Sequence, residues 1–239
     1  MSSSEIQRPI VPKGARARVR VLHSSDLHGN IASLWSRTDP FDVWLDTGDF
    51  FPNLTADGGE VDPVRETDFQ REWIRDDLPK LLSWLNGRPA LSMPGNHDYL
   101  ELSEVLHQAG ADARRIDPSG VDCAGLRWAG FREVKWMDGR WNGECLDFTK
   151  RIAETFARPP DVLVTHAPPA GVLDSELDFG IASLADAVRV ASGIRAHFFG
   201  HDHRRGGEWA DAWGTRFFNG AKTVHVREVI PDALSQVPD

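Results

Sequence analysis

The chain has 239 residues, and its 36 acidic and 27 basic side chains give a net charge of −9 at pH 7. This acidity disfavours binding to nucleic acid or an anionic membrane through bulk charge, although a local nucleic-acid site stays open. No run approaches the roughly 18 consecutive apolar residues of a membrane span, and the N-terminus lacks the apolar segment of a secretory signal. The two cysteines, Cys123 and Cys145, stand in no C-x-x-C pattern. We therefore expect a cytoplasmic protein without a membrane partner.

The remaining sequence predicts one domain behind a tail. Residues 1–17 are polar and contain two prolines and a glycine, so we expect a flexible N-terminal tail. No linker divides residues 18–239, which predicts a single domain. Short runs rich in Val, Leu, Phe and Trp predict strands, and amphipathic periodicity predicts helices. In chain order, the expected strands are 19–22, 43–45, 90–92, 126–131, 162–165, 197–199, 216–218 and 224–229, and the expected helices are 67–85, 100–108, 146–157 and 181–191.

The order of these elements indicates the fold class. Strands alternate with helices early in the chain and several strands follow late, which predicts an α/β domain with a mixed sheet. Pro79 is expected to kink or divide the first helix. Gly, Pro and Asp are frequent in residues 51–66 and 132–144. We expect long loops there, and loops of that length are often functional.

Five of the expected strands lead directly into short polar motifs. The motifs read D-L-H, G-D, G-N-H-D, T-H-A-P-P and G-H-D-H. Each motif alone also fits a turn or a polar loop. Because ligands bind beyond the carboxyl ends of strands in α/β sheets, five motifs in this order favour a functional site at one sheet edge. The motifs supply Asp26, His28, Asp49, Asn96, His97, Asp98, His166, His201 and His203.

The chemistry of these side chains indicates metal binding. Leaving His97 and Asp98 aside, the motifs offer two carboxylates, one amide oxygen and four imidazoles. Seven ligands exceed the needs of one tetrahedral zinc ion, but they suit two adjacent divalent ions that share a bridging carboxylate. Imidazole mixed with carboxylate, without thiolate, favours manganese, iron, zinc, cobalt or nickel over magnesium or calcium alone. Manganese is the cofactor we favour.

Together the motifs resemble those of the calcineurin-like metallophosphoesterases. The resemblance extends from about residue 19 to residue 220 and includes the spacing between motifs. Residues 165–174, 199–203 and 217–221 are most similar to the metallophosphoesterase-domain-containing branch, some members of which hydrolyse cyclic nucleotides. One departure stands after Asp49, where Phe50 and Phe51 occupy positions at which the family has Asp or Arg.

The resemblance implies a fold and a ligand assignment. The fold is a four-layer α-β-β-α sandwich with two mixed sheets and a binuclear metal site at the strand ends. Asp49 would bridge the two metal ions. One ion would be held by Asp26, His28 and His203, and the other by Asn96, His166 and His201.

These expectations lead to a hydrolytic mechanism. Water activated between two metal ions would attack a phosphate ester, and His97 would protonate the leaving oxygen. Asp98 would either orient His97 or raise its basicity, or it would instead cap the following helix. We favour a small phosphodiester as substrate, with cyclic or other nucleotides included. The alternatives are a phosphomonoesterase or protein phosphatase, a nuclease and, in a different class, a non-catalytic metal-binding module. The oligomeric state and the native metal pair stay open.

Several other side chains have weaker signals. Arg204 and Arg205 follow the last motif and could contact phosphate, although a solvated turn fits them better. His23 and His197 lie within apolar runs, which predicts buried core histidines. One or two aromatic side chains are expected to stack on a base or aryl group. The candidates are Phe50, Phe51, Tyr99, Trp136 and Trp141.

Overall fold

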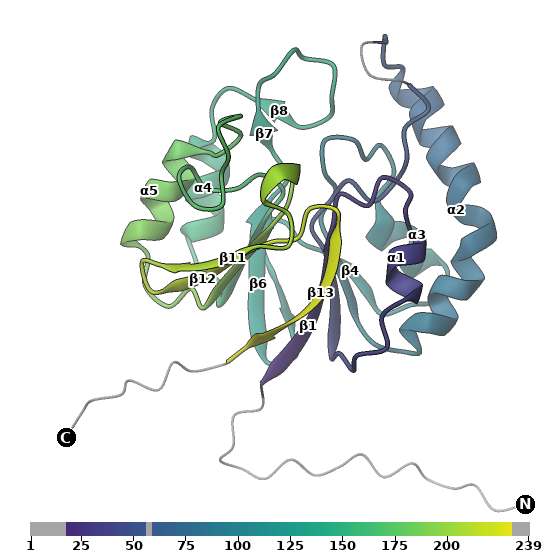
Figure 1. Ribbon diagram of the computed structural model, residues 1–239, viewed down its shortest axis with the longest axis horizontal. Helices are drawn as coiled ribbons and strands as arrows, with labels where there is room; N and C mark the ends of the chain where they lie inside the picture. The colour runs from purple at the N-terminus through teal and green to yellow at the C-terminus, as the bar shows by residue number, and fades with distance from the viewer. Residues whose placement is uncertain (1–17, 56–58, 231–239) are drawn as a thin grey trace, which may run out of the picture.

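The computed structural model describes residues 18–55 and 59–230. The tail expected at residues 1–17 therefore lies outside the described residues. Two β-sheets pack face to face, and helices cover the outer face of each sheet (Figure 1). This arrangement is the four-layer α/β sandwich that the sequence predicts. One long helix and two short helices lie over one sheet, and two further helices lie over the other sheet (Figure 1).

The first sheet contains the N-terminal half of the fold together with the last described strand. Its order is β13 (Thr223–Val229), β1 (Val19–Ser25), β2 (Val43–Asp46), β3 (Ala90–Ser92) and β4 (Ala113–Arg115). The β13 strand runs antiparallel to β1, and the other neighbours are parallel. The sheet is therefore mixed. The helices on its outer face are α1 (Ala32–Trp35), α2 (Pro63–Leu85) and α3 (Leu102–Gln108).

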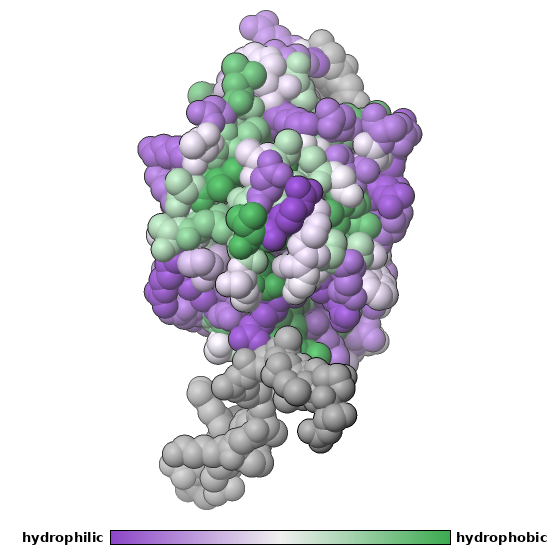
Figure 2. Space-filling model, turned by 90° about the vertical axis from the view of Figure 1, so that its left-hand side faces the viewer, coloured by the Kyte–Doolittle hydropathy of each residue, from purple (hydrophilic) through white to green (hydrophobic). Residues whose placement is uncertain are grey.

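The second sheet is also mixed. Its order is β11 (Trp209–Ala212), β12 (Thr215–Asn219), β10 (Ala196–Phe199), β9 (Val162–Thr165), β6 (Leu126–Phe131) and β5 (Val121–Cys123). The two outermost pairs are antiparallel and the inner pairs are parallel. Its helices are α4 (Thr149–Phe156) and α5 (Ala182–Val190), whose outer surface mixes polar and apolar side chains (Figure 2). A short parallel pair, β7 (Val134–Lys135) and β8 (Glu144–Cys145), stands apart.

Alternation along the strands explains the layers. Successive side chains of a strand point to opposite faces of the sheet. In β2, Val43 and Leu45 pack between the two sheets, whereas Trp44 packs against the helices. In β10, Phe198 packs between the sheets and Phe199 faces α4 and α5. Because both faces of the central strands are covered, these strands read as continuous apolar runs in the sequence.

Two helices begin three or more residues away from the predicted start. The α2 helix begins at Pro63, because the Asp62 carboxylate caps the backbone N–H groups of Val64 and Arg65 and proline suits the first helical position. It also continues through Pro79, so this proline does not divide it. Buried contacts of α2 on both sides of the proline offset the lost hydrogen bond. The helix expected at 146–157 begins only at residue 149, because residues 144–145 pair as a strand.

Gly130 provides a test of how closely β6 approaches β9. It lies opposite Val164 in the parallel ladder, and a Cβ atom there would overlap the Val164 carbonyl oxygen. We expect Gly130→Ala to lower the free energy of unfolding by about 3 kcal/mol or more, because the clash involves backbone. Urea unfolding measures this loss. Gly87→Ala is the control, since it meets open space with a φ of +74° and should cost only about 1 kcal/mol. Equal losses would contradict the close approach.

The described residues contain no helix with both the length and the apolar character needed to cross a bilayer. The longest described helix, α2, carries many charged side chains along its length. Two expected core histidines are confirmed. His23 is buried with its Nε2 3.1 Å from the Thr47 hydroxyl, and His197 is buried with its Nε2 2.8 Å from the Thr165 hydroxyl.

Candidate metal centre

The nine predicted site residues lie at one edge of the sandwich. Each follows a strand of one of the two sheets, and the carboxyl ends of these strands point the same way. The preceding strands are β1, β2 and β3 in the first sheet and β9 and β10 in the second. The structure therefore brings together residues from five separate loops, as expected for the ligand edge of an α/β sheet.

Asp26, His28 and His203 form one group. One ligand atom from each lies within 4.8 Å of the others. His203 Nε2 is 3.0 Å from Asp26 Oδ1, and the Ser25 hydroxyl donates a 2.6 Å hydrogen bond to Asp26 Oδ2. Burial raises the pKa of Asp26, but the hydrogen bond from His203 and nearby histidines lower it to about 2. The group therefore presents an ionised carboxylate beside two imidazoles.

Asp49, His166 and His201 form a second group with the same spacing. His166 Nδ1 lies 2.8 Å from the Thr47 carbonyl oxygen. Because a carbonyl only accepts, Nδ1 carries a proton and Nε2 faces the cluster, an arrangement typical of metal-binding histidines. Nε2 is 3.2 Å from Asp49 Oδ2 and 3.0 Å from Asn96 Oδ1, so Asn96 joins this group. Burial lowers the pKa of His166, but Asp49 and Asp26 raise it to about 9.

The Asp49 carboxylate faces both groups. Its Oδ2 atom lies 3.2 Å from His166 Nε2 in the second group and 3.9 Å from His28 Nε2 in the first. A single carboxylate at this distance from both groups suits a bridging ligand. Gly95 lets the loop after β3 lie close to the Asp49 carboxylate, because a Cβ atom at residue 95 would overlap Asp49 Oδ1.

The backbone at the site is held in an unusual conformation. Asp26, His28, Asp49 and His201 all have positive φ values, from 42° to 65°. Non-glycine residues adopt this left-handed region at a cost of roughly 1–3 kcal/mol each, and such residues cluster at functional sites. Each group also draws ligands from both sheets, because His203 joins Asp26 and His166 joins Asp49 across the sandwich.

The donor set fits two divalent cations. Within the described residues, His28 Nε2 is buried without a hydrogen-bond partner, and buried polar atoms are otherwise nearly always paired. The two carboxylates carry a charge of −2, which two divalent ions would more than neutralise. Because the set holds oxygen and imidazole nitrogen without thiolate, it suits the borderline divalent metals.

His97 lies beside the two groups but belongs to neither. Its Nδ1 atom is 2.8 Å from the Asn53 side-chain oxygen, and its ring packs on Trp141 with centroids 4.0 Å apart. The His28 ring lies on another side, 5.0 Å away and nearly perpendicular. Burial lowers the pKa of His97. Sequence reasoning missed Asn53, because no motif marks it.

Asp98 occupies neither of its two expected positions. Its carboxylate accepts hydrogen bonds from the backbone N–H groups of Asp49, Gly95 and Phe51, at 2.7, 2.8 and 3.1 Å. The predicted contact with the His97 ring is therefore wrong, and α3 has no side-chain cap. Three converging N–H groups from two loops satisfy the carboxylate better than either expected partner. Asp98 thus supports the loop that carries Asp49.

The structure sorts the aromatic candidates by burial. Phe50 and Phe51 are at most 1% exposed and pack against Trp73, so these two of the five candidates belong to the core and do not face substrate. Trp141 contacts His97, and Phe179, which sequence reasoning missed, contacts His201 with centroids 4.7 Å apart. Two partly exposed aromatic rings therefore flank the two metal-binding groups.

The arginines that follow the last motif are paired with acidic side chains. Arg204 contacts Glu176, and Arg205 lies 3.0 Å from Glu208. This matches the solvated-turn interpretation.

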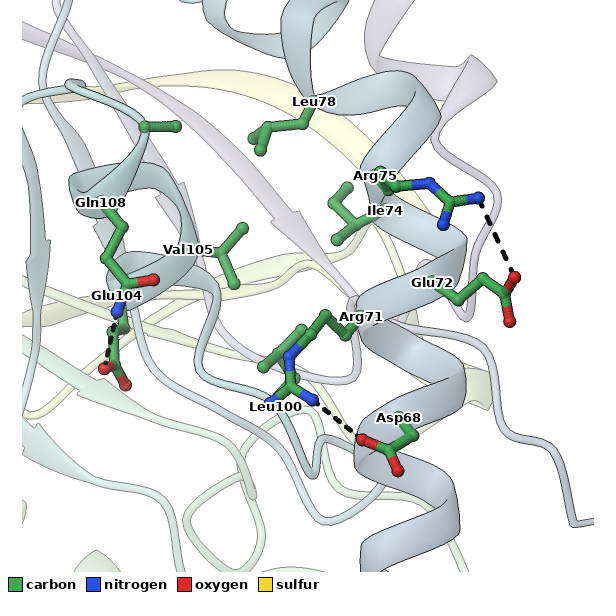
Figure 3. A pocket seen from close by; sticks show the side chains of 11 residues that line it. Asp68, Arg71, Glu72, Ile74, Arg75, Leu78, Leu100, Glu104, Val105 and Gln108 are labelled. Carbon is green, nitrogen blue, oxygen red and sulfur yellow. Dashed lines mark hydrogen bonds and ion pairs between the residues drawn. The ribbon is translucent and has the colours of Figure 1, made fainter.

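A separate hollow of about 580 Å³ lies between α2 and α3, with an apolar floor and paired polar side chains on its rim (Figure 3). None of the nine predicted site residues lines it.

The structure is therefore an α/β sandwich with two candidate metal-binding groups side by side at one edge. A family model described as calcineurin-like phosphoesterase matches residues 19–205, a range that contains all nine site residues. The chain therefore belongs to the calcineurin-like phosphoesterase family, which confirms the resemblance inferred from the motifs.

Two curated relatives and one solved structure illustrate the similarity. Metallophosphoesterase domain-containing protein 1 from Homo sapiens and the Mus musculus protein of the same name are each 24% identical over 225 residues. The match covers 91% of this chain but only 64% of each relative's length. One solved structure aligns with a TM-score of 0.58 at 14% identity, and covers 89% of this chain and 100% of its own. This last similarity supports the fold alone.

Proposed function

We propose that the chain hydrolyses a small phosphodiester that carries an aryl or nucleoside group. The observation that carries this proposal is the Asp49 carboxylate, which faces two groups of metal-binding side chains while His97 stands beside them. Such a centre combines a place for two cations with an independent proton donor. Membership in the phosphoesterase family supports the reaction class.

The chain's own residues divide the work of the reaction. Two divalent cations, with manganese favoured, would lower the pKa of a bound water and neutralise phosphoryl oxygens. Asp26, His28 and His203 would hold one cation, Asn96, His166 and His201 would hold the other, and Asp49 would be shared between them. His97 donates a proton to the leaving oxygen, because it borders both groups without contributing a ligand atom.

Two observations favour a diester with an aromatic part. Arg204 and Arg205 are paired with acidic side chains, so neither offers an unpaired charge to a second phosphate or to a dianionic monoester. Trp141 and Phe179 flank the ligand groups and provide apolar surface for an aryl group or a base. A small substrate also fits the acidic net charge of the chain, which disfavours a long polyanion.

A substrate screen with added manganese tests the proposal. We expect faster turnover of bis(4-nitrophenyl) phosphate than of 4-nitrophenyl phosphate, and measurable hydrolysis of at least one cyclic nucleotide. Chelator-treated protein is the control and should be inactive until manganese is restored. Faster monoester turnover would instead favour the phosphomonoesterase alternative. Bound metal without turnover on any ester would favour a non-catalytic module.

The cytoplasmic location predicted from the sequence stays a prediction, which cell fractionation would check.

A further inference from the structure

We infer that Asn53 is a positioning residue for His97, and this inference rests on the proposed acid role of His97. The Asn53 side-chain oxygen lies 2.8 Å from His97 Nδ1. Asn53 belongs to the loop after β2 and stands 44 positions before His97 in the sequence. Asn53 belongs to neither metal-binding group, and its contact with the chemistry of the site is the His97 ring.

Independent contacts fix which end of the Asn53 amide faces His97. The amide nitrogen donates a 3.0 Å hydrogen bond to the His97 carbonyl oxygen and lies 3.5 Å from Glu66 Oε2. Glu66 is buried and also accepts from the N–H groups of Leu54 and Thr55 at 2.8 and 2.7 Å. Because these partners only accept, the amide nitrogen must face them, and the amide oxygen must face His97.

This orientation determines the proton on His97. An amide oxygen can only accept a hydrogen bond, so His97 Nδ1 must carry a proton. Nε2 is then the nitrogen that exchanges a proton with the leaving oxygen. An amide oxygen accepts from Nδ1–H whether the ring is neutral or protonated, so the ring keeps its place throughout the reaction. Histidines in hydrolases commonly depend on a third group for this purpose.

The rest of the His97 environment prevents the ring from swinging away. The Trp141 ring covers one face of the imidazole at 4.0 Å. The loop that carries Trp141 is itself fixed by Glu144. The Glu144 carboxylate accepts hydrogen bonds from the backbone N–H groups of Met137, Asp138, Gly139 and Trp141. Asn53 is therefore the one group among the described residues that hydrogen-bonds the His97 ring within an otherwise packed setting.

The test compares two diesters of equal charge that differ in leaving group. Bis(4-nitrophenyl) phosphate releases a stable phenolate and needs little protonation, whereas diphenyl phosphate releases an unactivated phenolate. We expect Asn53→Ala to lower kcat on diphenyl phosphate roughly 10-fold or more, the size typical for loss of a histidine's orienting partner, and to change kcat on the activated ester less than about 2-fold. Asn53→Asp keeps the acceptor oxygen for His97 Nδ1 but sets a second oxygen against the His97 carbonyl and Glu66. It should therefore lower kcat on both esters and change the ratio of the two rates less than Asn53→Ala does.

A spectroscopic readout and a matched variant separate positioning from folding. In the zinc-loaded protein, ¹⁵N NMR should find the His97 proton on Nδ1, and Asn53→Ala should give a mixture of tautomers. Asn142→Ala removes one hydrogen bond to the backbone of the same loop, at the Asp98 carbonyl oxygen, but none to the His97 ring. It should therefore affect both esters in the same proportion, and so should any loss of folded protein.

The outcomes distinguish a failure of this inference from a failure of the proposed function. The inference fails alone if His97→Ala discriminates between the two esters and Asn53→Ala does not. Equal losses on both esters in His97→Ala would overturn the acid role and the inference together. If the metal-loaded wild type hydrolyses neither ester, the proposed function fails as well.

Discussion

Asp49→Ala is expected to lose both metal ions and to reduce diester hydrolysis to below about a thousandth of the wild-type rate. The Asp49 carboxylate lies 3.2 Å from one ligand group and 3.9 Å from the other, so its removal affects both. It also leaves the buried His166 without its acidic partner. Elemental analysis gives the number of ions per chain, and initial rates on bis(4-nitrophenyl) phosphate give the activity.

Single-group variants are the controls for Asp49. His203→Ala removes a ligand from the first group, and His201→Ala removes one from the second. Each should lower the affinity for one ion and leave the other bound. If Asp49→Ala keeps one ion at full occupancy, this carboxylate belongs to a single group and does not bridge.

His97→Ala is expected to keep both ions and to lose hydrolysis in proportion to leaving-group basicity. General acid help is typically worth about 10²–10⁴-fold, and we expect a loss in this range on diphenyl phosphate. The loss on bis(4-nitrophenyl) phosphate should be much smaller, because 4-nitrophenolate leaves without protonation. The ratio of the two rates, measured together with metal content, checks this expectation.

Metal loss in His97→Ala would contradict the division of labour at the site. His97 would then be a ligand, even though it lies outside both ligand groups in the structure. Asn142→Ala is a useful comparison, because it removes a side-chain hydrogen bond to the Asp98 carbonyl oxygen of the same loop without removing an imidazole.

The α/β class and the site edge could be predicted because their signals are local, whereas the four layers were implied by the family resemblance. Buried strands such as Val162–Thr165 read as continuous apolar runs, and a polar motif begins where each such strand ends. A histidine or aspartate directly after a strand must lie at the sheet edge, whatever the rest of the chain does. All nine predicted residues therefore lie at this edge of the sheets, although the contacts of Asp98 differ from those expected.

The missed features depend on contacts between distant segments. Asp98 accepts hydrogen bonds from a loop 47 and 49 positions away, and no pattern around Asp98 reveals those donors. Phe50 and Phe51 follow a ligand residue, so the sequence alone cannot separate a substrate wall from the core beneath α2. The start of α2 was obscured because its cap and first residue, Asp62 and Pro63, also fit a loop.

The crossing of ligands between the two sheets has a consequence for assembly. Asp26 and His203 are 177 positions apart in the sequence, yet they meet at 3.0 Å. Cations bound to these groups would join the first and last thirds of the chain, much as a covalent cross-link closes a long loop, and long loops benefit most from such closure. Neither group is complete until the two sheets have docked. Metal uptake and the final docking of the sheets would thus be a single coupled event.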